Sequence, residues 1–151
     1  MAHFYQLKKT QFLSASLDEV WNFIKNPSNL SKITPSSMDF RIQGEPPTQM
    51  YPGLMIHYRV KPLLGIPLTW VTEITQVIEK KYFVDEQRLG PYKLWHHEHY
   101  LEVKNDGILM TDIVSYCIGF GILDPLLHAL IVKGQLKKIF DFREQILANY
   151  F

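Results

Sequence analysis

Hydrophobic and polar residues alternate along most of the chain between residues 38 and 118, and this period of two constrains the fold more than any other feature. Successive side chains of a strand point to opposite faces of a sheet, whereas a helix repeats every three to four residues. Turn-forming residues divide the region into six predicted strands: 38–44, 54–61, 68–79, 82–88, 93–104 and 108–118. Asn105-Asp106-Gly107 is typical of a tight turn between the last two. Because the connections are short, we expect the strands to run antiparallel.

One more strand and a helix are expected before this region. Residues 3–13 have the pattern of a first strand. Ser16 and Glu19 form a capping box, in which each side chain satisfies a free backbone N–H of a helix start. The helix should cover 17–25 and place on one face Val20, Trp21 and Ile24.

A proline separates this helix from a second one. Asn26-Pro27 ends the first helix, because proline disfavours helical geometry in the residue before it. Ser28 is expected to cap a second short helix that ends before Pro35. The chain then enters the alternating region.

A long helix is expected at the C-terminal end. Asp124-Pro125 predicts its start, with Asp124 as the N-cap and proline at the first helical position. The helix should run to about Ala148. Its apolar stripe consists of Leu136, Phe140 and Leu147, and Arg143 lies on the same stripe.

These elements predict one α+β domain over residues 1–151. Its seven-stranded antiparallel sheet should curve around the long C-terminal helix, with two short helices between the first and second strands. A sheet with one face to bury needs such a cover. A strongly curved sheet rarely closes tightly on a single helix, so we expect a cavity between them.

Charge and composition exclude several classes of protein. Sixteen basic and 15 acidic residues give a net charge of +1, without the basic surface of a nucleic-acid-binding protein. Residues 114–132 are largely apolar, but Asp124, Pro125 and His128 interrupt them, so we expect no membrane span. The single cysteine, Cys117, excludes an internal disulfide and favours a reducing compartment. The N-terminal residues lack the apolar core of a signal peptide. We therefore expect a cytoplasmic protein.

The stretch Trp95-His96-His97-Glu98-His99 carries the densest functional chemistry. In a strand, Trp95, His97 and His99 share one face, and the aliphatic residues that follow on that face indicate that it is buried. Two imidazoles could ligate a metal, and a zinc site would need a third protein ligand. The candidates are Asp85, Asp112 and Glu73. Because none is convincing from sequence, and no second His pair or Cys set exists, we expect a hydrogen-bonded network and no metal.

Other polar residues should join these histidines on the inner face. Alternation places Asp85 and Gln87 on one face of their strand and Asp112 and Tyr116 on one face of theirs. Buried carboxylates need partners, and Arg143 on the helix stripe is the natural one, through a bidentate bond. The network could serve only to rigidify the fold. Alternatively, part of it stays free to bind a polar group of a ligand.

The chain resembles the helix-grip superfamily, also called SRPBCC, which includes START domains, Bet v 1-like proteins and polyketide cyclases. Within it, the resemblance is to a bacterial ligand-binding subgroup related to polyketide cyclase-like proteins. It covers almost the whole chain. The motifs that carry it are Asn29-Leu30, Ile33-Thr34-Pro35, Gly65-Ile66-Pro67-Leu68, Trp70, residues 83–87, Gly90-Pro91-Tyr92, Trp95-His96-His97, His99, Asp112, Tyr116, Phe140 and Arg143.

The resemblance implies the fold but not one activity, since this fold hosts carriers, sensors and enzymes. We expect a small, largely apolar molecule to bind between sheet and helix, with no cofactor. Its apolar walls should include Tyr58, Trp70 and Trp95, with a further hydroxyl from Tyr116. The groups expected to orient it are Asp85, Gln87, His97, His99 and Asp112.

Two other functions stay open. A cyclase- or dehydratase-type enzyme could use a His–Asp pair as general acid and base in the same cavity, although we favour binding over catalysis. A protein-interaction module could use the apolar loop 62–67 as a partner surface. We expect this loop to be a lid.

Overall fold

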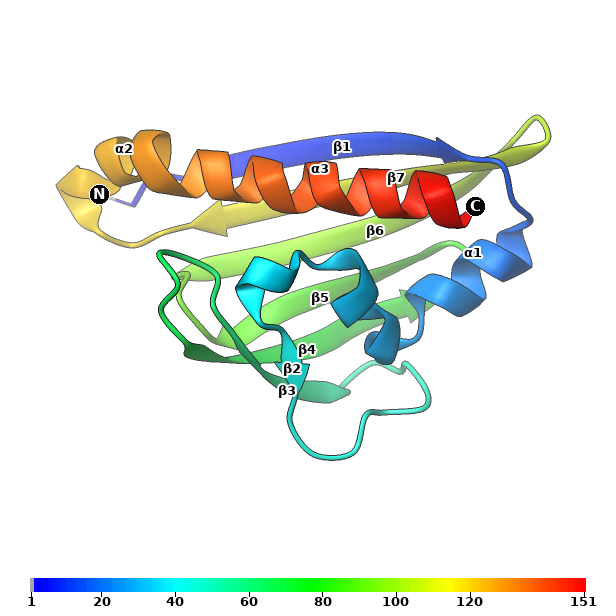
Figure 1. The fold of residues 1–151 in the computed structure, drawn as a ribbon, viewed down its shortest axis with the longest axis horizontal. Coiled ribbons are helices and arrows are strands. Elements are labelled where there is room, and N and C mark those ends of the chain that lie inside the picture. Colours follow the sequence, from blue (N-terminus) through cyan, green and yellow to red (C-terminus); the bar gives the residue numbers. More distant parts are fainter. Residues whose placement is uncertain (1) are drawn as a thin grey trace.

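Seven antiparallel strands form one sheet, in the order β1-β7-β6-β5-β4-β3-β2 (Figure 1). The computed structural model describes residues 2–151. The strands are β1 (Tyr5–Leu13), β2 (Arg41–Ile42), β3 (Met55–Val60), β4 (Leu68–Ile78), β5 (Tyr82–Leu89), β6 (Leu94–Lys104) and β7 (Gly107–Cys117). Strands β2 to β7 pair in chain order, and β1 joins the sheet beside β7. The predicted antiparallel sheet is therefore confirmed.

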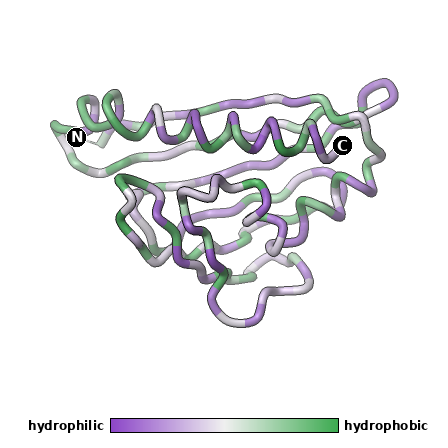
Figure 2. The backbone as a smooth tube through the Cα atoms, in the orientation of Figure 1, coloured by the Kyte–Doolittle hydropathy of each residue, from purple (hydrophilic) through white to green (hydrophobic). Residues whose placement is uncertain are grey.

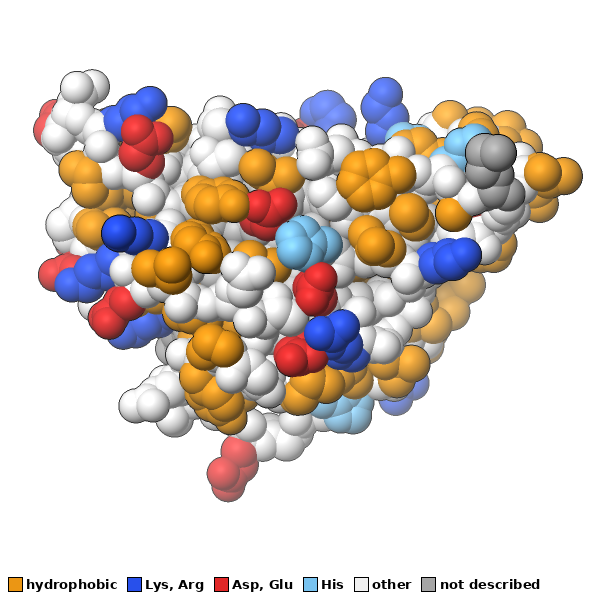
Figure 3. Space-filling model, turned by 180° about the vertical axis from the view of Figure 1, so that it is seen from behind, with side chains coloured by type: hydrophobic (Ala, Val, Ile, Leu, Met, Phe, Trp, Pro, Cys, Tyr) orange, Lys and Arg blue, Asp and Glu red, His pale blue; other side chains and the backbone are white. Residues whose placement is uncertain are grey.

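Helix α3 (Lys133–Tyr150) runs along one face of the sheet (Figure 1). Hydrophobic and hydrophilic residues alternate along it (Figure 2). The side chains that it buries are Leu136, Phe140, Arg143 and Leu147, which is the predicted stripe. The opposite face of the sheet is mixed, with charged, histidine and hydrophobic side chains side by side (Figure 3). The core therefore lies between the sheet and α3.

Helix α1 (Leu17–Ile24) begins with the predicted capping box. Ser16 Oγ accepts the N–H of Glu19 at 3.3 Å, and Glu19 Oε2 accepts the N–H of Ser16 at 2.8 Å. The buried face includes Phe23, which the sequence did not predict, whereas Ile24 is only half-buried.

The second short helix starts two residues earlier than expected. It is the 3-10 helix η1 (Pro27–Ile33), and its cap is Asn26, not Ser28: Asn26 Oδ1 accepts the N–H of Ser28 at 3.0 Å. Pro27 takes the first helical position, where its missing N–H costs nothing, so the cap falls on the preceding residue. Helix η1 contacts α3.

The predicted strand over 38–44 is shortened to two residues. Helix η2 (Ser36–Met38) occupies its beginning, and Asp39 has a left-handed backbone with φ of 45°. Such a conformation interrupts an extended chain. Pairing with β3 is therefore limited to Arg41 and Ile42.

Asp124 does not act as the N-cap that the sequence suggests. It is the first residue of helix α2 (Asp124–Leu127), which follows the 3-10 helix η3 (Gly121–Leu123). Its buried carboxylate accepts the backbone N–H groups of Phe120 and His3. It therefore ties the chain's start to this corner.

A π-helical turn, η4 (His128–Val132), joins α2 to α3, and α3 ends two residues beyond the expected Ala148. Within residues 2–151, none of the helices combines the length and the apolar character that crossing a bilayer requires.

Candidate functional site

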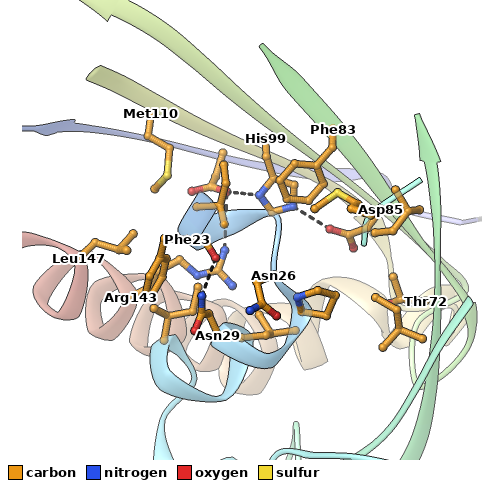
Figure 4. Close-up of a pocket in the computed structure, with 18 of the residues that line it drawn as sticks. Phe23, Asn26, Asn29, Thr72, Phe83, Asp85, His99, Met110, Arg143 and Leu147 are labelled. Atoms are coloured by element: carbon orange, nitrogen blue, oxygen red, sulfur yellow. Dashed lines mark hydrogen bonds and ion pairs between the residues drawn. The ribbon is translucent and has the colours of Figure 1, made fainter. Parts of the chain in front are cut away.

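Two adjoining cavities lie between the sheet and α3. The first has a volume of ≈ 90 Å³ and is lined mainly by apolar side chains of α1, η1, the sheet and α3 (Figure 4). The second has a volume of ≈ 120 Å³ and extends toward Trp70 and Trp95. The residues that border both are Leu30, Tyr58, Asp85, His99 and Arg143. These five side chains mark the junction of the two cavities.

Five polar residues form a buried polar cluster at this junction: Asp85, His97, His99, Asp112 and Arg143. Strand pairing places them. Asp85 on β5 lies directly opposite His97 on β6, and His99 on β6 lies opposite Asp112 on β7. Because alternate residues share a face, four of the five meet on the inner face of three neighbouring strands. Arg143 reaches them from α3.

Both histidines lie between the two carboxylates. On one side, Asp112 Oδ1 is 2.9 Å from His97 Nε2 and 3.0 Å from His99 Nδ1. On the other side, Asp85 Oδ2 is 2.7 Å from His99 Nε2 and 3.6 Å from His97 Nδ1. His99 thus has a carboxylate oxygen within hydrogen-bond distance of each ring nitrogen. His97 has one at Nε2 only.

These contacts shift the pKa values of the two rings in opposite directions. Burial alone would lower the pKa of His99, but Asp112 and Asp85 outweigh it and the pKa is raised. The protonated ring can donate from both nitrogens. For His97, burial and the neighbouring charge of His99 lower the pKa despite the hydrogen bond to Asp112. His97 is therefore the neutral ring of the pair.

The carboxylates stay ionised in spite of their burial. Burial favours the neutral acid of Asp112, yet the hydrogen bonds and charges of His97 and His99 hold its pKa well below the ordinary value. Burial likewise acts to raise the pKa of Asp85, but the hydrogen bond from His99 and the nearby cations lower it. The two anions, Asp85 and Asp112, therefore lie against the guanidinium of Arg143 and against His99, whose pKa they raise.

Arg143 is only loosely paired. Its Nη1 lies 3.6 Å from Asp112 Oδ1, so the contact is a single long ion pair and not the expected bidentate bond. Its Nε is buried and has no hydrogen-bond partner among residues 2–151. The guanidinium carbon lies 4.9 Å from the centre of the Phe140 ring. Arg143 therefore retains donors at the junction of the cavities (Figure 4).

The predicted aromatic residues do line the cavities. Tyr58 borders both, and Trp70 and Trp95 border the second. Thr72 holds Tyr58 and Trp70 in place. Its Oγ1 lies 2.9 Å from Tyr58 Oη and accepts the Trp70 Nε1–H at 3.1 Å. Burial, with the charge of Asp85, raises the pKa of Tyr58 and keeps its hydroxyl neutral.

Gln87 and Tyr116 are not among the described residues that line the two cavities. Gln87 holds the β5–β6 connection: its Nε2 donates to the Tyr92 carbonyl at 2.6 Å, and its Oε1 accepts the Tyr92 N–H at 3.1 Å. The Tyr116 hydroxyl lies 2.8 Å from His128 Nε2, at the start of the C-terminal helical region. In the structure both side chains therefore make local contacts.

Cavity walls that sequence reasoning missed come mostly from the segment between β1 and β3. Asn26, Asn29 and Leu30 border the first cavity, and Tyr92 borders the second. The short apolar spacing of Leu30 and Ile33 was a signal that η1 packs inward, since they lie one helical turn apart. This spacing does not reveal which part of the sheet or helix α3 the helix η1 packs against.

The loop 62–67 has a packed base and an exposed tip. Pro62 is buried and borders the second cavity, whereas Leu64 and Ile66 are exposed. Leu64 has a left-handed backbone with φ of 53°. The loop therefore adjoins the second cavity through Pro62, and its apolar tip is exposed to solvent.

The candidate third metal ligands are placed very differently. Glu73 pairs with Arg88, with its Oε2 2.5 Å from Arg88 Nε, and is not part of the group that includes the histidines. Asp85, by contrast, lies beside the histidines. One carboxylate oxygen of Asp85, one ring nitrogen of His97 and one of His99 all lie within 4.8 Å of one another. The sequence left the choice among these carboxylates open; in the structure Asp85 and Asp112 both lie against the histidines.

Comparisons with known proteins bear on the fold. A scan against protein-family models found no match, and a search of curated proteins found no significant one. Among solved structures, ginseng major latex-like protein 151 from Panax ginseng is 12% identical, with 97% of each chain covered and a TM-score of 0.70. A point mutant of norcoclaurine synthase from Thalictrum flavum is 13% identical, covering 99% of this chain and 98% of that one, with a TM-score of 0.67.

A protein of Mycobacterium smegmatis, Ms6760, is 17% identical, covering 97% of this chain and 92% of that one, with a TM-score of 0.67. At these identities the likeness concerns the fold. The sheet order, the helices between β1 and β2 and the long C-terminal helix agree with it. The chain therefore has the helix-grip fold, which it shares with the Bet v 1-like proteins of known structure.

Proposed function

We propose that the protein binds a small, largely apolar molecule in the joined cavities, and that this molecule carries one group that accepts hydrogen bonds. The observation that carries the proposal is Arg143. A buried guanidinium with an unpaired Nε lies at the junction of two mainly apolar cavities. Unsatisfied buried donors are costly, and a ligand that accepts from them recovers that cost.

The chemistry of the walls supports this class of ligand. Apolar side chains such as Ile56, Ile74 and Leu147 dominate the first cavity, and aromatic and aliphatic side chains together line most of the second. Small-molecule sites combine apolar walls with a few polar groups that fix orientation. In this proposal the apolar walls give affinity, and Arg143 with Asp85 and His99 gives orientation.

A second function has a specific observation in its favour. His97 is the neutral imidazole, its Nε2 is held by Asp112, and it borders the second cavity. Its Nδ1 lies 3.6 Å from the nearest carboxylate oxygen, beyond hydrogen-bond length. A neutral imidazole oriented by a carboxylate is the arrangement of a general base. A cyclase- or dehydratase-type reaction is thus the alternative, with His97 as base.

The binding proposal is tested with the anionic apolar dye anilinonaphthalene sulfonate. We expect one dye per folded chain. Leu30 borders both cavities, so Leu30→Trp should fill the junction and weaken binding by at least about tenfold, the equivalent of about 1.4 kcal/mol. The control Ile78→Trp adds the same bulk at an exposed position of β4 and should leave binding unchanged.

Trp95→Ala should alter dye binding more than it alters the far-ultraviolet circular dichroism spectrum, because Trp95 borders the second cavity. Equal dye affinity in the wild type, Leu30→Trp and Trp95→Ala would refute a cavity site. Native mass spectrometry of gently purified protein then identifies any retained molecule.

A further inference from the structure

We propose that Asp85, His97 and His99 form a binding site for a divalent transition metal ion of the zinc type, open toward the cavities. This goes beyond ligand binding and does not depend on it. The observation is the convergence of three ligand atoms from β5 and β6 that lie within 4.8 Å of one another.

Asp112 gives the two histidines the orientation that a metal site requires. Its Oδ1 is 2.9 Å from His97 Nε2 and 3.0 Å from His99 Nδ1, so one carboxylate oxygen takes one nitrogen of each ring. The remaining nitrogens, His97 Nδ1 and His99 Nε2, both lie toward Asp85 Oδ2, at 3.6 and 2.7 Å. Metal-binding histidines generally donate their other N–H to such a carboxylate, which fixes the ring and its tautomer.

Two of the three separations are close to those around a first-row ion. Ligand atoms at about 2.0–2.2 Å from a metal lie roughly 2.8–3.6 Å apart when they are adjacent in octahedral or tetrahedral geometry. The 3.6 Å separation of His97 Nδ1 and Asp85 Oδ2 is close to this range. His99 Nε2 and Asp85 Oδ2 are closer, at 2.7 Å, because a proton now joins them. A metal would replace that proton and move the two atoms apart by a few tenths of an ångström.

The metal is expected on the Asp85 side of the rings and not on the Asp112 side. Arg143 Nη1 lies 3.6 Å from Asp112 Oδ1, so a second cation there would meet a fixed positive charge. Asp85 and His99 border both cavities, and His97 borders the second. Three protein ligands leave a coordination position for water or for a ligand in the cavity, as in catalytic zinc sites.

Two imidazoles and one carboxylate select the class of ion. Nitrogen ligands favour zinc, iron, cobalt or nickel over calcium and magnesium, which prefer oxygen. No thiolate is part of the group. The appropriate probes are therefore Zn²⁺ for affinity and Co²⁺ for spectroscopy.

Calorimetric titration of the chelator-treated full chain with Zn²⁺ tests the proposal. We expect one Zn²⁺ per chain. His99→Gln and Asp85→Asn should each weaken Zn²⁺ binding by at least about 100-fold. Removing a residue that only supports a metal ligand already costs about 10- to 100-fold in affinity, and removing the ligand itself should cost more. The matched control is His96→Gln, the neighbour on the outer face of β6, whose ring contacts Glu86 at 2.8 Å. It should bind Zn²⁺ as the wild type does.

Absence of Zn²⁺ binding to folded wild type, or its loss in His96→Gln with retention in His99→Gln, would overturn the proposal. A measurement on the wild type covers the case in which the variants do not fold. Bound Co²⁺ should shift and broaden the ring resonances of His97 and His99 far more than those of His96, His57 or His128. Paramagnetic shifts centred on another histidine contradict the site. The outcome is independent of dye binding, so failure of either proposal leaves the other standing.

Discussion

Asp85 and Asp112 contact opposite edges of the same two imidazole rings. Asp112 Oδ1 takes His97 Nε2 and His99 Nδ1, and Asp85 Oδ2 lies against the other nitrogen of each ring. The strand register creates this arrangement, because each carboxylate is the direct cross-strand partner of one histidine. The relationship ties the electrostatics of the cluster to its position between the cavities.

The two histidines should titrate on opposite sides of the ordinary imidazole value in metal-free protein. The charged groups near the two histidines are Asp85, Asp112 and Arg143, and the two rings also lie against each other. These groups raise the pKa of His99, while burial and the charge of His99 lower that of His97. Proton-detected nitrogen spectra over a pH series should show that His99 keeps both ring protons to a higher pH than His97 does.

The raised pKa of His99 determines how its contribution to the unfolding free energy depends on pH. A raised folded pKa means that His99 contributes stability below the unfolded pKa of about 6.5, and that this contribution is lost as pH rises through the folded pKa. The difference in unfolding free energy between wild type and His99→Gln should therefore shrink as pH rises in that window. A difference that grows instead would mean that His99 is neutral in the fold.

Gln87 should prove structural. Its side chain makes two hydrogen bonds to the backbone of Tyr92, and it borders neither cavity within the described chain. Gln87→Ala should lower the unfolding free energy by about 1–3 kcal/mol, because two partly buried hydrogen bonds are lost. Denaturant unfolding measures this. Dye affinity should stay unchanged, and the exposed control Gln76→Ala should cost less than about 0.5 kcal/mol.

Much of the fold was predictable because its signals are local. The strand periodicity, the capping box at Ser16 and the apolar stripe of α3 each depend on residues a few positions apart. Alternation also placed Asp85, His97, His99 and Asp112 on the inner face. These four lie at regular positions of paired strands, so period and register together bring them into contact.

The errors fall where local rules compete or where tertiary packing decides. Gln87 shares the period of Asp85, but it reaches the backbone of the β5–β6 connection instead of the cavity. Asp124 is a residue type that commonly caps helices, yet the 3-10 helix η3 precedes it. Its carboxylate therefore accepts the N–H of Phe120, four residues earlier in the chain. Which carboxylate lies beside which histidine depends on the register between strands, which one sequence does not reveal.

The tip of the loop 62–67 should control the exchange of a bound molecule if the loop is a lid. Leu64 and Ile66 are exposed, and Pro62 at the base borders the second cavity. The double variant Leu64→Asn with Ile66→Thr should change stability by less than about 0.5 kcal/mol, since both side chains are on the surface and Asn tolerates the left-handed backbone of residue 64. Stopped-flow release of the dye should be faster than in the wild type.

The comparison for this loop is Ile122→Thr, which removes an exposed apolar side chain far along the sequence, in η3. It should leave the release rate unaltered. If the double variant also releases dye at the wild-type rate, the tip is not a lid, and its apolar residues are better explained as a surface for a partner.

Arg143 and Asp112 should be energetically coupled, although their contact is long. Arg143→Met keeps most of the apolar volume but leaves Asp112 without one cation. Asp112 still contacts His97 and His99, so the cost should be about 1–3 kcal/mol, typical of a buried group that loses one partner. Asp112→Asn should cost more, about 3–5 kcal/mol, because it leaves the charges of both His99 and Arg143 under-compensated.

Combining the two changes distinguishes an ion pair from simple proximity. The double variant Arg143→Met with Asp112→Asn should lose less unfolding free energy than the sum of the single losses, by roughly 0.5–3 kcal/mol, the range for residues in contact. Urea unfolding at fixed pH measures all three. Arg41→Met serves as the surface control, since its partner Asp39 is exposed and such pairs contribute at most about 1 kcal/mol. Additive losses would mean that Arg143 does not stabilise Asp112, and its guanidinium would then be free to serve a bound ligand entirely.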